Sequence, residues 1–122
     1  MGVSKTDQLG IDVLPTGEGF RLLQVRGFIT IRNCETLQAT LEGVKKQNVI
    51  LEMSEVPYMD SAGLGVLLNG QMNAQKDGGQ VILAGLTRRV RDLLQLTKTD
   101  SLFRIYETPE KAVLGGIKKA GA

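Results

Sequence analysis

The chain has 122 residues, which is the length of one domain with a single hydrophobic core. Fifteen basic and thirteen acidic side chains leave a formal net charge of +2, and only two tyrosines and three phenylalanines are present, so nucleic-acid binding is not expected. One cysteine and no histidine exclude an internal disulfide and the usual zinc ligand sets, and they suit a reducing, cytoplasmic location.

The first half of the chain predicts a β-hairpin followed by a helix. Ile11 and Val13 alternate with polar residues, and residues 20–25 form a second apolar run after a glycine-containing turn. The next apolar positions step by three and four, the spacing of an amphipathic helix: Cys34, Leu37, Leu41 and Val44. Asn33 is the candidate cap of this helix.

The second half alternates between strands and helices. Apolar runs predict buried strands at residues 49–53, 81–84 and 102–106. Helices are expected from near Ser61 to Asp77, through residues 87–94, and from residue 108 onward. The last helix opens with a cap, a proline at the first helical position and an early acid, in the sequence Thr108-Pro109-Glu110.

This alternating order predicts an α/β fold with a mixed, mostly parallel sheet of about five strands and about four packed helices. We expect one domain spanning residues 1–122, with its core at about residues 8–114. Residues 115–122 are rich in glycine and lysine and are expected to fray. No apolar run approaches the roughly 20 residues of a membrane helix, so no membrane insertion is predicted.

The turn between the strand at residues 49–53 and the following helix carries the most distinctive residues. Asp60 or Ser61 can cap this helix by accepting a hydrogen bond from one of its first N–H groups. Asp60 can also orient the Ser61 hydroxyl or add to an acidic face. Without histidine no serine–histidine arrangement can form, and no carboxylate pair at catalytic spacing stands out, so neither enzyme activity nor a cofactor is expected.

The sequence Met59-Asp60-Ser61-Ala62-Gly63-Leu64-Gly65 resembles the signature of STAS domains, in particular the bacterial anti-sigma factor antagonists. In that family a partner kinase, which is itself the anti-sigma factor, phosphorylates the serine after the aspartate. The resemblance implies that Ser61 is a phosphorylation site. It also implies that the following residues face the partner: Met59, Asp60, Ser61, Ala62, Gly63 and Leu64, with Phe28 and Thr30 on a neighbouring loop.

Several of these residues also have a purely structural interpretation. Met59 and Leu64 are expected to pack in the core or at its rim. Gly63 and Gly65 resemble part of a dinucleotide fingerprint, but Leu68 stands where the third glycine would be, so close packing or a glycine-built partner surface is the simpler interpretation.

The loop sequence Gly27-Phe28-Ile29-Thr30 departs from the family pattern, which has glycine, an acid, an aliphatic residue and aspartate. In the family this loop lies beside the phosphorylated serine and helps to engage the kinase. Phe28 is therefore either an apolar contact for a different partner or a buried residue at the end of a strand.

The leading hypothesis is that the unphosphorylated chain binds an anti-sigma factor of the histidine-kinase-like ATPase fold and so releases a sigma factor. Phosphorylation of Ser61 adds about −1.5 to −2 charges and ends this binding, and a phosphatase resets it. The alternative is a STAS scaffold subunit of a signalling or lipid-transport assembly, in which Ser61 only caps the helix. Replacing Ser61 by alanine would then cost about 1 kcal/mol of stability.

Overall fold

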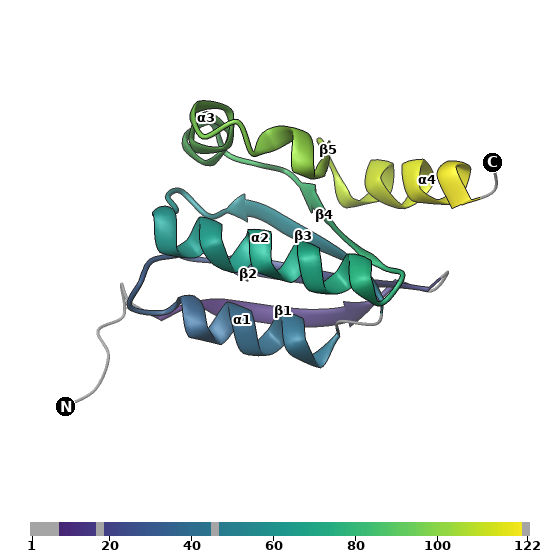
Figure 1. The fold of residues 1–122 in the computed structure, drawn as a ribbon, viewed down its shortest axis with the longest axis horizontal. Helices are drawn as coiled ribbons and strands as arrows, with labels where there is room; N and C mark the ends of the chain where they lie inside the picture. Colours follow the sequence, from purple (N-terminus) through teal and green to yellow (C-terminus); the bar gives the residue numbers. More distant parts are fainter. Residues whose placement is uncertain (1–7, 17–18, 45–46, 121–122) are drawn as a thin grey trace.

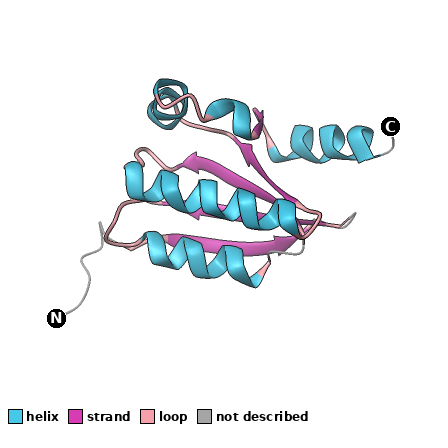
Figure 2. Cartoon of the chain, in the orientation of Figure 1, coloured by secondary structure: helices cyan, strands magenta, loops and turns pink. Residues whose placement is uncertain are grey.

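The computed structural model describes residues 8–16, 19–44 and 47–120, which form a sheet with helices packed on both faces (Figures 1 and 2). Five strands lie side by side in the order of the chain: β1 (Gly10–Pro15), β2 (Phe20–Arg26), β3 (Asn48–Glu55), β4 (Gln80–Ala84) and β5 (Arg104–Tyr106). β1 and β2 are antiparallel, whereas the other three neighbouring pairs are parallel. The predicted hairpin and the mixed, mostly parallel sheet are confirmed.

The described residues contain four α-helices and a short 3₁₀ helix. They are α1 (Cys34–Gly43), α2 (Ser61–Lys76), α3 (Arg88–Leu96), η2 (Asp100–Leu102, 3₁₀) and α4 (Pro109–Ala120). The α4 helix starts as expected, because the Thr108 hydroxyl accepts a hydrogen bond from the backbone N–H of Lys111 at 3.2 Å. None of these helices has both the length and the apolar surface that a membrane crossing needs, as far as the described chain extends.

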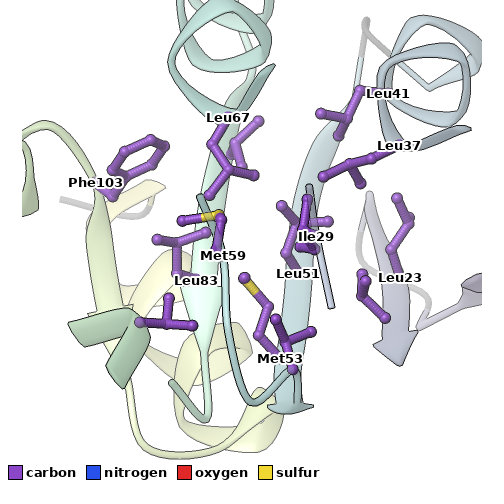
Figure 3. Packing of buried hydrophobic residues seen from close by; sticks show 14 of the residues in the cluster. Leu23, Ile29, Leu37, Leu41, Leu51, Met53, Met59, Leu67, Leu83 and Phe103 are labelled. Carbon is purple, nitrogen blue, oxygen red and sulfur yellow. The ribbon is translucent and has the colours of Figure 1, made fainter. Parts of the chain in front are cut away.

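The strands separate two apolar clusters because successive side chains point to opposite faces of the sheet. On one face Leu51 and Leu83 pack with residues of α1, α2 and α3 in a large buried cluster (Figure 3). On the other face Ile50 and Ile82 pack with Ala112 of α4. α1 and α2 lie side by side over the first face (Figure 1). The chain passes from the end of the central strand β3 through a short turn into the start of α2.

The last strand of the sheet starts later than the sequence predicts. The prediction of a strand at residues 102–106 was too long at its start, because η2 includes Leu102 and the strand begins only at Arg104. The backbone N–H of Leu102 donates to the carbonyl of Thr99 at 3.0 Å, a bond that closes a tight turn and not a sheet ladder. The fraying of residues 115–122 stays a prediction; α4 extends to Ala120, and residues 121–122 lie outside the described residues.

Candidate functional site at the start of α2

Two loops meet beyond the carboxyl ends of β2 and β3. Ile29 and Met59 form an isolated parallel bridge, in which the N–H of Ile29 donates to the carbonyl of Tyr58 and the N–H of Asp60 donates to the carbonyl of Ile29, each at 3.0 Å. Both bridge side chains are buried in the large cluster. The bridge fixes residues 27–33, called here the Phe28 loop, against the start of α2.

Asp60 is the cap of α2. Its backbone is extended, and its Oδ1 accepts a hydrogen bond from the backbone N–H of Gly63 at 3.0 Å, as expected of an N-cap aspartate. Its Oδ2 accepts a second hydrogen bond, from the backbone N–H of Ile31 in the Phe28 loop, also at 3.0 Å. One carboxylate therefore satisfies a free N–H group of the helix and at the same time holds the neighbouring loop.

Ser61 is the first residue of α2 and is exposed. Its hydroxyl makes no hydrogen bond with the described part of the chain, so the interpretation that Ser61 caps the helix is wrong. The reason is positional: the cap is the residue before the first helical residue, and Asp60 occupies that place. The Ser61 hydroxyl is left accessible at the positive end of a 16-residue helix.

The two glycines at the start of α2 differ in their surroundings. Gly63 is buried, and a Cβ at this position would lie 2.7 Å from the Ile29 Cγ2 and 2.7 Å from the Met59 Cγ. Gly63 is thus required for close packing of the helix on the Ile29–Met59 bridge. A Cβ on Gly65 would meet no atom within 4 Å, and this glycine is exposed.

The neighbouring apolar residues of the motif pack as expected. Met59 and Leu64 are buried at 3% and 6% exposure, and they belong to the large cluster. Ala62 is half-buried. Direct contact of a partner with these residues stays a prediction. The buried side chains of Met59 and Leu64 fix the position of the backbone on either side of Ser61.

The structure corrects one interpretation of Phe28. Its side chain is 47% exposed and faces the Tyr58 ring, with 6.1 Å between the ring centroids and an interplanar angle of 58°. Ile31 in the same loop is 70% exposed. The alternative of a buried phenylalanine at a strand end is therefore wrong, and an exposed apolar surface lies beside Ser61 instead.

Asn33 holds the backbone of the Phe28 loop in place. Asn33 is buried and occupies the N-cap position of α1, as predicted, but its side chain makes no cap hydrogen bond. Its Nδ2 donates to the carbonyl of Phe28 at 2.7 Å, and its Oδ1 accepts from the backbone N–H of Thr30 at 2.9 Å. These bonds curl the loop backbone around the amide, with Thr30 half-buried.

The start of α3 completes the site with Arg89, whose side chain is exposed. The guanidinium carbon of Arg89 lies 5.7 Å from the centroid of the Tyr58 ring, in the geometry of a cation–π contact. Between α2 and α3 is an open depression of about 460 Å³, whose lining includes Tyr58, Ser61, Arg89, Asp92 and Leu96. The sequence pattern does not indicate the contact of Arg89 with Tyr58, because this contact depends on how α3 packs against the turn before α2.

A family model described as the STAS domain matches residues 13–112, which include all the site residues described above. The chain belongs to the STAS domain family. The resemblance carried by the motif at residues 59–65 is thereby confirmed, and the five-stranded mixed sheet is the fold shared by solved proteins of this family.

Three similar proteins illustrate the range of this STAS family. BtrV of Bordetella bronchiseptica, whose name provisionally gives it as an anti-sigma factor antagonist, is 28% identical over 98 residues, which are 78% of this chain and 84% of BtrV. An anti-sigma factor antagonist from Mycobacterium paratuberculosis has the same fold, with a TM-score of 0.81 and 22% identity over 93% of this chain and 97% of its own. The murine anion transporter Slc26a9 also contains the fold, with a TM-score of 0.69 and 19% identity over 79% of this chain and 17% of the transporter.

Proposed function

We propose that this STAS protein is an anti-sigma factor antagonist whose partner binding is switched off by phosphorylation of Ser61. The observation that carries the proposal is the exposed hydroxyl of Ser61, which has no hydrogen-bond partner among the described residues and lies next to a carboxylate that already caps α2. Because the fold does not depend on this hydroxyl, a phosphate can be added there without the loss of a structural hydrogen bond. The names of relatives such as BtrV support the general role.

The position of Ser61 suits a reversible change of charge. A phosphate brings about −1.5 to −2 charges and three acceptor oxygens to the end of a helix, where the helix dipole and the free N–H groups favour an anion. The folded state therefore tolerates the modification. A partner surface that fits a neutral hydroxyl beside Asp60 is repelled by it, so phosphorylation separates the two proteins.

The proposed partner is an anti-sigma factor of the histidine-kinase-like ATPase fold that also acts as the serine kinase. It would contact the start of α2 and the exposed side chains beside it, Phe28, Ile31 and Tyr58. Aromatic side chains of this kind often supply much of the energy of an interface. A phosphatase acting on Ser61 would restore binding. Phosphorylation and dephosphorylation would both take place in the cytoplasm, and this chain would hold no cofactor.

A labelling experiment tests the switch directly. Parent, Ser61→Ala and Ser61→Asp chains are used as baits in a lysate of the native host, and the recovered kinase is purified and incubated with each chain and labelled ATP. We expect the alanine bait to retain the kinase, the aspartate bait to lose it, and the label to enter the parent but not Ser61→Ala. Ser101→Ala is the matched control, since Ser101 is an exposed serine on η2, and it should be labelled like the parent.

The second candidate function is a STAS subunit of a larger signalling or lipid-transport assembly. It is favoured by Phe28, which is exposed at a loop position where the antagonists usually have an acid. In that case both the alanine and the aspartate baits would recover the same partners, and no kinase would label Ser61. This outcome would overturn the phosphoswitch and leave the Phe28 loop as the first place to look for contacts.

A further inference from the structure

We propose that Arg89 of α3 binds the phosphate group when Ser61 of α2 is phosphorylated. Both residues line the open depression between the two helices. The inference rests on the proposed phosphorylation of Ser61 and adds a second residue, from a different element, to that switch.

No carboxylate of the described residues forms an ion pair with Arg89. Its guanidinium lies over the Tyr58 ring, and within the described chain it makes no salt bridge, although Asp92 is only three residues further along α3. A cation held only by an aromatic face at an exposed site is held weakly. The side chain is therefore available to a stronger acceptor that arises nearby.

A phosphate on Ser61 is such an acceptor. Guanidinium groups bind phosphate oxygens through two parallel charge-assisted hydrogen bonds, which are stronger than the attraction to a ring. Among the residues that line the depression, all of them described, Arg89 is the one cation, whereas Asp60 and Asp92 are anions. The phosphate is thus placed among two carboxylates and one arginine, and Arg89 is the group that compensates its charge.

This arrangement gives phosphorylation a second effect on the surface. The phosphate adds charge at Ser61, and it also draws the guanidinium away from Tyr58, whose ring stands next to Phe28. A partner that binds these aromatic side chains then meets both a new anion and an altered aromatic surface. Both effects lie on the same face of the molecule, and both weaken the binding of the partner.

The test uses full-length chain in which phosphoserine is incorporated at position 61 during translation, so that it needs no kinase. The pKa of the second phosphate ionisation is measured by ³¹P NMR at low salt for the parent, Arg89→Gln and Arg88→Gln chains. A nearby cation favours the dianion, so the parent pKa should lie below that of Arg89→Gln by roughly 0.3–0.6 pH unit. Arg88 is exposed and does not line the depression, so Arg88→Gln should titrate like the parent.

Two further measurements make the result specific. The difference between the parent and Arg89→Gln should shrink in about 0.5 M salt, because salt screens exposed charges. The Tyr58 ring resonances of the parent should move on phosphorylation toward those of Arg89→Gln, because both chains then lack the guanidinium over the ring. Arg88→Gln should again behave like the parent.

Equal phosphate pKa values for the parent and Arg89→Gln would overturn the proposal. The proposal would also be overturned if the phosphate pKa rose equally in Arg88→Gln and Arg89→Gln, because the rise would then reflect the net charge alone. Because the phosphate is supplied by synthesis, failure to find a kinase leaves this test intact. Conversely, a negative result for Arg89 leaves the labelling of Ser61 unaffected, so the two proposals fail separately.

Discussion

Asp60 accepts a hydrogen bond from the backbone N–H of Ile31, 29 residues earlier in the chain, at 3.0 Å. Its other carboxylate oxygen caps α2 through the N–H of Gly63. The same side chain therefore decides where the helix begins and where the Phe28 loop lies relative to it. Asp60 therefore stabilises the turn, whereas the Ser61 hydroxyl has no hydrogen-bond partner among the described residues.

The first prediction concerns this double role. Asp60→Ala should lower the free energy of unfolding by about 1–3 kcal/mol, because one helix N–H and one loop N–H lose their acceptor. Urea denaturation measures the change, and faster hydrogen exchange at the Ile31 amide should accompany it. Asp92→Ala removes an exposed carboxylate that makes no hydrogen bond in the described chain, and it should change stability by less than about 0.5 kcal/mol. Equal losses in the two variants would contradict the capping role.

The second prediction is that Ser61→Ala leaves the stability almost unchanged. The hydroxyl has no hydrogen-bond partner among the described residues, and alanine is a good helix former, so a change within about 0.5 kcal/mol is expected in the same denaturation experiment. This differs from the loss of about 1 kcal/mol that a capping serine would give. A loss of that size would mean that the hydroxyl is bonded in solution and would weaken the case for a freely accessible phosphorylation site.

The third prediction compares two glycines on one helix. In Gly63→Ala the new methyl group would crowd Ile29 and Met59 at 2.7 Å, so the free energy of unfolding should fall by about 1–2 kcal/mol. In Gly65→Ala the methyl group meets open space, and the stability should rise by up to about 1 kcal/mol because alanine has the higher helix propensity. Thermal or urea denaturation of the parent and the two variants measures these changes in the free energy of unfolding. The same sign for both would show that the helix start is packed differently from the structure.

Much of this fold was predictable because its signals are local. Apolar runs marked the strands, and the steps of three and four residues from Cys34 to Leu37 and Leu41 marked α1. The motif at residues 59–65 marked the candidate site by its resemblance to the STAS signature, and within it Asp60 caps the helix and Gly63 allows its close packing. What could be predicted was the turn that carries the candidate site, with Ser61 at the start of α2; the use of this turn by a partner stays a prediction.

The surroundings of Ser61 were harder to predict because they depend on contacts between distant segments. Asn33 occupies the N-cap position of α1, as predicted, but its side chain donates to the carbonyl of Phe28, five residues earlier, and so holds the loop. Arg89 is exposed on α3, and it also lies over the ring of Tyr58 in the turn before α2. Neither contact has a periodicity, and each requires the tertiary fold before it can be inferred.

The buried side-chain amide of Gln71 also has a role that the sequence alone does not indicate. Gln71 of α2 accepts a hydrogen bond from the N–H of Val81 at 2.6 Å and donates to the carbonyl of Leu102 at 2.9 Å. It joins α2 to β4 and to η2, and it helps to hold Leu102 in a turn where a strand was predicted. A polar residue in a helix gives no sign of such a role, because the same residue type is far more often exposed.

The last prediction concerns the exposed aromatic side chain of the Phe28 loop. Phe28→Ala should cost little stability, because the side chain is 47% exposed, but it should weaken binding of the unphosphorylated chain to the kinase recovered with the alanine bait by tenfold or more. Isothermal titration calorimetry measures the affinity. Met72→Ala is the matched control, since Met72 is 59% exposed and lies about 16 Å further along α2 than Ser61, and it should bind like the parent.

Unchanged affinity for Phe28→Ala would exclude the loop from the interface and confine the partner to α2 and α3. If Phe28→Ala and Met72→Ala weakened binding equally, the effect would be a general loss of apolar surface and would not locate the partner. A selective loss for Phe28→Ala would instead explain the departure of this loop from the acidic family pattern: the acid would have been replaced by an apolar anchor beside the same serine. The partner should then present an apolar pocket opposite Phe28 and Tyr58, within reach of Ser61.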